Sequence, residues 1–424
     1  MKIYCSGIGG IGLSAYAALA AARGDTVSGS DRIDSALLDD LRSQGVSVYL
    51  EQDGSRISND TDLFVFSEAI PLDSPERMRA RELNIRSISY FEALGELSKE
   101  YRVIAVCGTH GKSSTTAMVA KMLIDAGLDP TVVVGTKMHE LHERNWRAGK
   151  SDIFVLEACE YRKSFLHLSP DVALMTTVDG DHFDAFTSLE DYQQAFVDFL
   201  MKLPPDGYVI THGGDVDCMS VAQRSGRRIV DADMQPGITL LTPGAHMRRN
   251  ARLALALADT LKIPRDAAQK SVGEYRGSWR RMEVKGESNG VTVIDDYGHH
   301  PAEIRATLEA MREAYGDRRI ICVFQPHTHD RTIKLYDDFT TAFSDADIVI
   351  VPDIYVARGD IEHGTVDVAT FVDDIAQRSR VQGVDGKNLQ ETEELLRSQI
   401  LQPGDVLVTM GAGDITTLSD RMLV

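Results

Sequence analysis

The stretch with the clearest chemical potential is CGTHGKSSTT at residues 107–116. It joins an apolar strand expected at 102–108 to an expected helix, so backbone amides at the helix start can cradle phosphates. Lys112 can reach the β- and γ-phosphates of a nucleotide, and the Ser113 hydroxyl can join Mg²⁺. The alternative is a glycine turn with a solvated lysine, but the flanking strand and helix favour a phosphate loop. The loop residues are Gly108, Thr109, His110, Gly111, Lys112, Ser113 and Ser114.

Hard oxygen ligands for a metal ion follow two other expected strands. Glu157 stands at the carboxyl end of the strand expected at 152–160, where parallel sheets place their ligands. The strand expected at 171–178 runs into DGDHFD at 179–184, and acidic residues beside His182 suit Mg²⁺ coordination or charge steering. The alternative for these aspartates is a polar turn that caps the next helix. A lone histidine is usually structural, so the interpretation of His182 depends on its acidic neighbours.

A second glycine loop, GIGGIG at 7–12, follows the strand expected at 2–7. It matches the dinucleotide fingerprint G-x-G-x-x-G, and Asp31 ends the next expected strand. Taken alone, the loop is compatible with NAD or FAD, with another nucleotide such as a UDP-sugar, or with a tight turn that packs a helix on a strand. The glycines of this fingerprint are Gly7, Gly9, Gly10 and Gly12.

Several later polar stretches stand at the ends of expected strands, where a parallel sheet places its ligands. Two of them are rich in histidine and could cap helices, but together they favour a ligand site. The stretches are HMRRN at 246–250, RRME at 280–283, DDYGHHP at 295–301 and QPHTHDRT at 325–332.

The elements that must position these residues repeat as strand, loop and helix, the pattern of parallel α/β domains. We expect three α/β domains, at 1–98, 99–283 and 284–424: a Rossmann-like domain, a P-loop ATPase-like parallel-sheet domain and a second Rossmann-like domain. In the third, strands are expected at 291–298, 319–326, 347–354 and 405–414. A helix is expected to begin at Pro301, because Ile304, Leu308, Met311 and Tyr315 fall on one face.

Composition excludes several other classes of protein. The 424 residues carry 45 Lys and Arg against 64 Asp and Glu, a net charge of −19, which argues against a nucleic-acid-binding protein. No apolar run of about 18 residues is present, so we expect no membrane span. The five cysteines are scattered, which favours a reduced cytoplasm over a disulfide framework. An Ala-rich N-terminal stretch superficially resembles a signal peptide, but the glycines of residues 7–12 interrupt it.

Taken together, these motifs resemble the Mur ligase family over essentially the whole chain. The matching segments, in the family's order, are GIGGIGLS at 7–14, SEAIPLDSPE at 67–76, GTHGKSSTTAM at 108–118, EACEYRKSFLHLSPD at 157–171, DGDHFDAF at 179–186, HMRRNA, RRME, DDYGHHPAEI, FQPHTHDRT and MGAGDI. The resemblance implies an ATP- and Mg²⁺-dependent amide ligase of peptidoglycan precursor synthesis. Within the family it is closest to the branch that joins L-alanine to UDP-N-acetylmuramate through an acyl phosphate.

The resemblance also assigns roles to single residues. It gives Lys112 to the ATP phosphates, Ser113 and Glu157 to one Mg²⁺, and His182 to a second. Asn250 is expected near the adenine and Arg281 near the phosphates, while His299 and Arg331 are expected to hold the muramate end or the amino acid. The glycine loop of the first domain is expected to bind the UDP-sugar, with Gly7, Gly9, Gly10, Gly12, Asp31 and Ser67 as its contacts.

Four positions depart from the pattern of many relatives. Cys159 replaces Asp, Thr177 replaces Asn, and Phe196 stands where many Mur ligases have a carbamylated lysine, as expected of the alanine-adding branch. Gly359 replaces an acidic residue expected to contact the amine, a role that Asp360 or Glu362 could take. The alternatives are a ligase that attaches a tripeptide to the same sugar, an NAD-dependent oxidoreductase and a non-catalytic regulator. The expected partners are small molecules only, with a monomer or homodimer in the cytoplasm.

Overall fold

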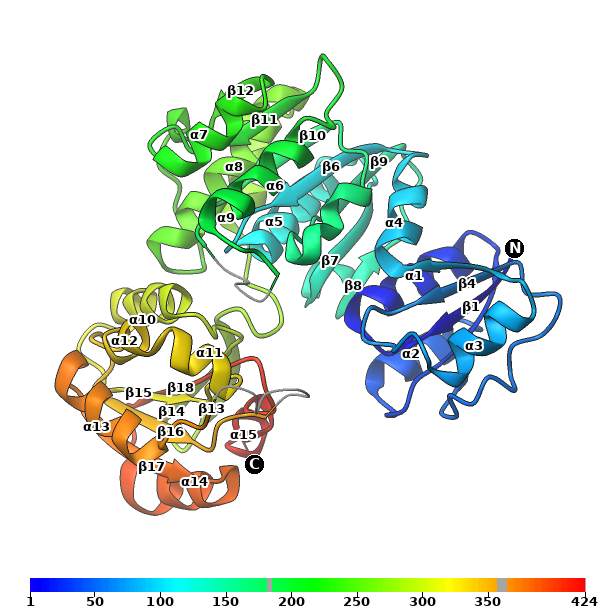
Figure 1. Cartoon of the computed structure of the whole chain (residues 1–424). Coiled ribbons are helices and arrows are strands. Elements are labelled where there is room, and N and C mark those ends of the chain that lie inside the picture. Colours follow the sequence, from blue (N-terminus) through cyan, green and yellow to red (C-terminus); the bar gives the residue numbers. More distant parts are fainter. Residues whose placement is uncertain (181–184, 357–363, 424) are drawn as a thin grey trace. The chain divides into compact units, whose positions relative to one another are not determined.

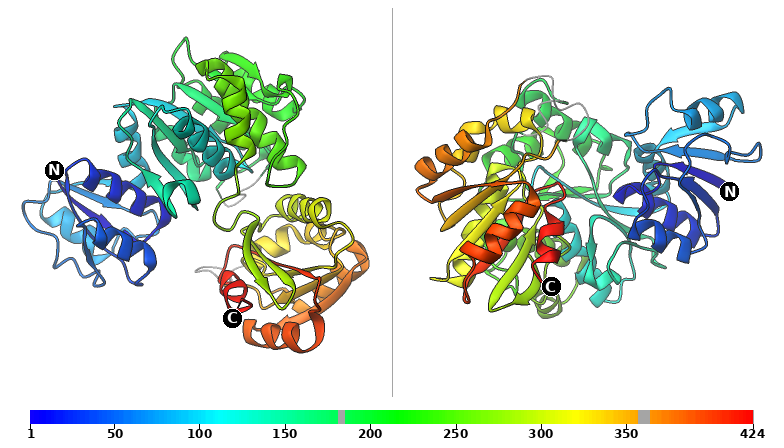
Figure 2. Two further views of the ribbon diagram at one scale, coloured as in Figure 1. Left: turned by 180° about the vertical axis from the view of Figure 1, so that it is seen from behind. Right: turned by 90° about the horizontal axis from the view of Figure 1, so that it is seen from below.

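The computed structural model describes residues 1–180, 185–356 and 364–423. These residues pack into two compact units, the first formed by 1–238 and 249–275 and the second by 239–248 and 276–424. Three β-sheets are present in the described residues, two in the first unit and one in the second, each flanked by helices (Figure 1; Figure 2). No helix found among the described residues has the length and apolar character needed to span a membrane.

The first sheet is parallel throughout, and its strand order places the first glycine loop at a ligand-binding position. From β1 the chain builds outward to β2 and β3, then returns to the other side of β1 to form β4 and β5. Ligands of open α/β sheets bind where the order reverses, beyond the carboxyl ends of the strands, which here means between β1 and β4. In sheet order the strands are β3 (Ser47–Tyr49), β2 (Thr26–Ser30), β1 (Lys2–Ser6), β4 (Leu63–Phe66) and β5 (Arg86–Ser89). The helices are α1 (Ile11–Ala22), α2 (Ala36–Ser43), α3 (Pro75–Glu82) and α4 (Tyr90–Ser98).

The second sheet has β6 at its centre, between β10 and β9, and only the pairing of β7 with β8 is antiparallel among its described strands. The carboxyl ends of β6, β9 and β10 therefore meet at one edge of the sheet. In sheet order the strands are β12 (Arg228–Asp231), β11 (Tyr208–Thr211), β10 (Val172–Met175), β6 (Arg102–Cys107), β9 (Ile153–Glu157), β7 (Thr131–Met138) and β8 (Arg144–Arg147). The helices are α5 (Lys112–Asp125), α6 (Leu189–Leu200), α7 (Val216–Arg224), α8 (Ala245–Leu261) and α9 (Arg265–Gly273), with short helices η1 (His139–Leu141), η2 (Tyr161–His167) and η3 (Ala232–Met234).

The third sheet begins with an antiparallel hairpin and continues with parallel strands. Asn289 and Gly290, both at positive φ, close the hairpin, as expected of an Asn-Gly turn. In sheet order the strands are β13 (Glu283–Ser288), β14 (Val291–Asp296), β18 (Val406–Met410), β15 (Ile320–Phe324), β16 (Ile348–Pro352) and β17 (Gln382–Lys387). The helices are α10 (Pro301–Tyr315), α11 (His329–Lys334), α12 (Tyr336–Thr340), α13 (Val368–Ser379), α14 (Leu389–Leu395), η4 (Leu396–Ile400) and α15 (Thr416–Arg421).

The α/β fold class and the helix beginning at Pro301 are confirmed. The side chain of His300 caps α10 and Glu303 completes a capping box, which explains why the helix begins there. Ile304, Leu308 and Met311 are buried on one face, as their spacing predicts. The domain boundaries 1–98, 99–283 and 284–424 remain a prediction.

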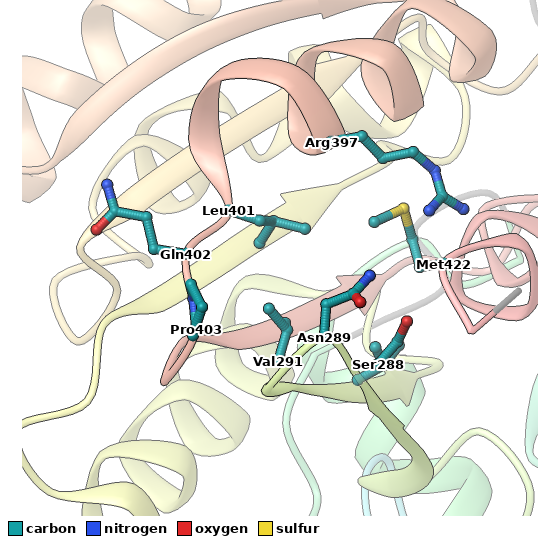
Figure 3. Close-up of a pocket in the computed structure, with 9 residues that line it drawn as sticks. Ser288, Asn289, Val291, Arg397, Leu401, Gln402, Pro403 and Met422 are labelled. Carbon is teal, nitrogen blue, oxygen red and sulfur yellow. The ribbon is translucent and has the colours of Figure 1, made fainter.

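A cavity of about 200 Å³ lies in the second unit, beside the hairpin turn that closes β13 and β14. Its lining is mixed: Val291, Leu401 and other apolar residues share it with Ser288, Asn289, Arg397 and Gln402 (Figure 3). Because Val291 and Pro403 stand at or just before the amino ends of β14 and β18, the cavity is at the edge of the sheet where strands begin. Of the polar stretches singled out in the sequence, DDYGHHP and QPHTHDRT lie at the carboxyl ends of β14 and β15, RRME runs into the start of β13, and HMRRN lies in α8. None of them lines this cavity, which therefore takes no part in the candidate site.

A cluster of aromatic rings surrounds Phe196 on α6. The ring of Phe165 meets Phe196 edge-on at 5.3 Å, and Tyr192 meets it at 5.2 Å. Phe199 stacks on Phe165 at 4.5 Å, and all four side chains are almost completely buried. Phe196, which the family resemblance predicts to stand where many Mur ligases have a modified lysine, is therefore part of the apolar core.

Replacing this core phenylalanine with lysine tests that interpretation. Phe196→Lys buries an ammonium group among aromatic rings, so the free energy of unfolding of the first unit should fall by at least about 3 kcal/mol. Phe196→Leu, which keeps the apolar character, should cost about 1–2 kcal/mol. Urea denaturation of the full chain measures both. Equal stability of the two variants would show that position 196 tolerates a charge.

Candidate nucleotide and substrate sites

The turn from β6 into α5 has room only for glycine at two positions. Gly108 has φ +136°, and a Cβ there would lie 2.0 Å from Oγ1 of Thr176. Gly111 has φ +80°, and a Cβ there would lie 2.7 Å from Oδ1 of Asn250. Gly111 is also the N-cap of α5, so the N-cap residue makes no side-chain hydrogen bond to the first amides of this 14-residue helix. A close backbone approach and open helix amides together form a cradle suited to phosphate.

Lys112 lies folded over this loop. Its ammonium donates to the carbonyl oxygens of Gly108 at 2.6 Å and Thr109 at 2.9 Å. It also pairs with the carboxylate of Glu160, at 3.0 Å to Oε1 and 2.9 Å to Oε2. Burial lowers the pKa of Lys112, but the nearby carboxylate of Glu160, with smaller contributions from Cys159 and Glu157, raises it more, so the net shift is upward. Lys112 is therefore charged at neutral pH, and its ammonium lies against the carbonyls of the phosphate loop.

Strand β10 holds the loop from its other side through Thr177, the next residue but one after the strand. The carbonyl of Thr177 accepts the amide of Thr109 at 2.9 Å, and its hydroxyl accepts the amide of His110 at 3.1 Å. The hydroxyl of Thr109 donates to the carbonyl of Asp179 at 2.7 Å and contacts the Tyr192 hydroxyl at 2.9 Å. The departure at Thr177 thus retains an oxygen that fixes the loop, and the Thr109 side chain is engaged within the protein.

The predicted metal ligands of the first unit lie at the same sheet edge. Ser113 is buried in the first turn of α5, as is Ser114. Glu157 ends β9, and its Oε2 accepts the amide of Gly135 on β7 at 2.8 Å. His182 lies outside the described residues, and among those that are described no three His, Cys, Asp or Glu gather closely enough to hold a metal ion.

Asn250, expected near the adenine, belongs to α8 and is buried against the phosphate loop. Its side-chain amide fills the space next to Gly111, which is the reason that a Cβ at Gly111 would collide with it. The structure thus brings together the phosphate loop and Asn250, which are more than a hundred residues apart in the sequence.

The first glycine loop is shaped by bonds to β2. The amides of Gly7 and Ile8 donate to the carbonyl of Ser30 at 2.9 and 3.0 Å. The amide of Gly9 donates to Oδ2 of Asp31 at 2.9 Å, and the other oxygen of Asp31 accepts the amide of Ile33 at 3.3 Å. Both carboxylate oxygens of Asp31 therefore accept hydrogen bonds from backbone amides, which suits a role in shaping the loop.

The surroundings of this loop also leave little room for a side chain at Gly7 and Gly12. A Cβ at Gly7 would lie 3.0 Å from Cβ of Ser67, which follows β4, and a Cβ at Gly12 would lie 2.8 Å from the Tyr90 ring. Gly10 is the N-cap of α1 and no side chain caps that helix, so its first amides face the loop. Ser67 and the glycine loop thus meet at the position between β1 and β4 that favours ligands.

Glu76 is a buried carboxylate of this region that the sequence analysis did not single out. It accepts the hydroxyl of Tyr4 at 2.6 Å, that of Ser30 at 2.7 Å and that of Ser6. These hydroxyls belong to β1 and the end of β2, so Glu76 ties the two strands that carry the loop to the start of α3. The available signal was Pro75 before Glu76, typical of a helix start, which does not reveal a buried acid.

In the second unit, His299 follows β14 and is held by its neighbours. Its Nδ1 lies 3.1 Å from the carbonyl oxygen of Tyr297, and Glu303 is 3.5 Å away. Burial lowers the pKa of His299 to about 4; Arg331 and Arg281 push it the same way, while Glu303 opposes them. The His327 ring is 6.5 Å from that of His299, so the two histidine-rich strand ends do meet.

The two arginines of RRME have different environments. Arg280 is buried, and its guanidinium donates to Asp295 at 3.1 Å and to the carbonyls of Gly411 and Gly413. The side chain of Arg281 is 28% exposed, lies 5.0 Å from the Tyr297 ring centroid and is 3.8 Å from Glu303. Arg280 therefore supports the core, and Arg281, the one predicted to contact phosphates, is the accessible member.

Arg331 is carried by α11, a helix of six residues that begins after Thr328. The hydroxyl of Thr328 accepts the Arg331 amide at 3.3 Å, and Thr328 itself has φ +69°. Positive φ is unfavourable for a β-branched residue, so the turn that presents Arg331 is strained. Such strain is typical of functional loops. Gly359, Asp360 and Glu362, the positions considered for the amine contact, lie outside the described residues.

Known protein families match consecutive parts of this chain. The Mur ligase family, catalytic domain, matches residues 2–102; the Mur ligase middle domain matches 106–258; and the Mur ligase, glutamate ligase domain, matches 280–413. The chain belongs to the Mur ligase family, which confirms the resemblance inferred from its motifs.

The chain is also similar to individual members of this family and to solved structures. Proteins named UDP-N-acetylmuramate–L-alanine ligase from Clostridium novyi and Clostridium acetobutylicum are 36% and 37% identical, over 100% of this chain and 97% of each relative. The crystal structure of UDP-N-acetylmuramate-alanine ligase from Thermotoga maritima has a TM-score of 0.83 at 27% identity, covering 100% of this chain and 98% of that one. A murein peptide ligase from Psychrobacter arcticus has the same fold, with a TM-score of 0.73 at 22% identity and coverage of 100% and 98%.

A methyl group in the phosphate loop should block nucleotide binding. Gly108→Ala places Cβ against Thr176 at a backbone conformation that L-residues avoid, so the loop must shift, and ATP affinity should fall by about tenfold or more. Gly127→Ala is the matched control, because Gly127 also has positive φ but nothing lies within 4 Å of its Cβ position. Calorimetry with ATP measures both variants. Wild-type affinity in Gly108→Ala would contradict the close approach at this turn.

The depressed pKa of His299 predicts a specific pH dependence. With a pKa of about 4 against an ordinary 6.5, His299 is neutral at pH 7, and the unfolded chain takes up its proton first as pH falls. The free energy of unfolding of the second unit should therefore decline from about pH 6.5 to pH 4, and less steeply in His299→Gln. NMR titration of the ring protons, assigned by comparison with His299→Gln, should give a midpoint near 4. A midpoint above 6 would contradict the burial of this ring.

Proposed function

We propose that this protein joins L-alanine to UDP-N-acetylmuramate in an ATP-dependent reaction of peptidoglycan precursor synthesis. The observation that carries the proposal is the glycine cradle at the start of α5, with the charged Lys112 folded over it. The names of relatives 34–37% identical over nearly the whole chain support the same substrates and disfavour a tripeptide. Family membership likewise disfavours an NAD-dependent oxidoreductase.

The chemistry follows from what an amide bond requires. A carboxylate is a poor acceptor for an amine, because oxide is a poor leaving group. Transfer of the γ-phosphoryl group of ATP to the muramate carboxylate gives an acyl phosphate, and attack by the amine of L-alanine then releases phosphate. The products are ADP, phosphate and the amide. Lys112 contributes positive charge close to the transferred phosphoryl group, and the loop amides orient it.

Mg²⁺ fits the donors available beside the loop. Mg²⁺ prefers hard oxygen ligands and is usually held by one or two protein groups together with substrate phosphates. The Ser113 hydroxyl and the Glu157 carboxylate are such groups, and His182 is assigned to a second ion. When bound with ATP, Mg²⁺ neutralises phosphate charge.

The remaining assignments extend the proposal to the other substrates. The glycine loop at 7–12, with Asp31 and Ser67, is assigned to the UDP-sugar, and Asn250 to the adenine. His299, Arg331 and Arg281 are assigned to the muramate end, the amino acid and the phosphates. A cytoplasmic location agrees with the supply of these substrates and with five free cysteines. The proposed partners are small molecules, and the protein is assigned as a monomer or homodimer.

A product assay tests the proposal. Incubation with ATP, Mg²⁺, UDP-N-acetylmuramate and each amino acid should give ADP and phosphate most rapidly with L-alanine. With ¹⁸O in the sugar carboxylate, label should appear in the released phosphate. Lys112→Ala should abolish turnover yet retain UDP-N-acetylmuramate binding, because the glycine loop at 7–12 belongs to another sheet. Formation of AMP, or turnover only with a tripeptide, would overturn the assignment.

A further inference from the structure

The ammonium of Lys112 already uses all of its hydrogen-bonding capacity. A lysine has three N–H donors. Two point to the carbonyls of Gly108 and Thr109, and the third faces the carboxylate of Glu160. A phosphate oxygen therefore cannot be bound by Lys112 until one of these three partners is given up.

Of the three partners, Glu160 is the one whose charge opposes the nucleotide. Its side chain is 0% exposed, so water screens its negative charge poorly. The loop carbonyls belong to the cradle itself, and their geometry is fixed by the bonds from Thr177. When a polyanion enters the cradle, the carboxylate competes with it for the ammonium and also repels it.

We propose that Glu160 is a positioning residue that keeps Lys112 in a resting arrangement, from which the ammonium transfers to the terminal phosphates when ATP binds. Glu160 thereby sets the affinity for nucleoside triphosphates. The inference rests on the proposed ATP binding and goes beyond it, because it gives a role to a residue outside the phosphate loop. A carboxylate with a purely structural role would instead support the loop, and its loss would weaken ATP binding.

Removing the charge while keeping the shape separates these two roles. In Glu160→Gln, Lys112 retains an oxygen acceptor but loses its competing anion, so the dissociation constant for ATP with Mg²⁺ should fall by about fivefold. AMP, which lacks the terminal phosphates, should bind with unchanged affinity. UDP-N-acetylmuramate binding should also be unchanged, because the glycine loop at 7–12 belongs to another sheet. Calorimetry on the full chain measures all three ligands.

Glu100→Gln is the matched control for net charge. It removes the same single charge from the first unit, but Glu100 is 58% exposed and pairs with Arg23, 2.6 Å away. Its ATP affinity should equal that of the wild type. If Glu160→Gln fails to fold, Glu160→Asp takes its place: the shorter side chain lengthens the pair with Lys112, and ATP binding should tighten to a smaller degree.

The outcomes distinguish this inference from the proposed function. Unchanged or weaker ATP binding in a folded Glu160→Gln or Glu160→Asp overturns the role of Glu160, even if the wild type ligates L-alanine. Tighter ATP binding together with absence of ligase activity supports Glu160 and overturns the ligase assignment. A wild-type chain that binds no ATP overturns both.

Discussion

The arrangement of the candidate nucleotide site depends on the absence of space beside Gly108. Strand β10 runs next to β6 and brings Thr176 so close that even a methyl group at Gly108 cannot fit. Gly108 adopts a positive φ of +136° at this close approach, and the turn leads directly into Lys112 and the first residues of α5. The amides of Thr109 and His110 then donate to Thr177, just beyond the end of β10, and these bonds fix the turn. The catalytic potential of the loop is thus a product of strand spacing as much as of the residues in the loop.

The glycine turns at 7–12 and 108–111 both belong to the first unit, but the side chains that support them differ in charge. Both lead from a central parallel strand into a helix with glycine at its N-cap and no capping side chain there. Around the loop at 7–12 the supporting side chains are carboxylates, with Asp31 bonded to backbone amides and Glu76 to buried hydroxyls. Around the phosphate loop a lysine faces a carboxylate across the turn. The proposed sites for the sugar nucleotide and the triphosphate thus use similar backbones with different supporting side chains.

The sequence was sufficient to predict features that are encoded locally. Glycines between an apolar strand and a helix identify a turn, and Pro301 followed by regularly spaced apolar residues identifies α10. The sequence was not sufficient to predict contacts between residues that are far apart in the chain. Glu160 lies 48 residues from Lys112, and Glu76 lies 72 residues from Tyr4. A buried carboxylate has no local pattern that separates it from a surface one. The sequence likewise does not show that Arg280 is buried while the neighbouring Arg281 remains accessible.

The aromatic cluster around Phe196 has a consequence for the chemistry that the protein needs from its surroundings. A carbamylated lysine forms only by reaction of an uncharged amine with carbon dioxide, and the modification is reversible. Phenylalanine at this position needs no chemical modification after the chain has folded. Its ring packs against Phe165 and Tyr192. Position 196 therefore imposes no dependence on dissolved carbon dioxide or bicarbonate, and nothing at this position is lost by dilution or acidification.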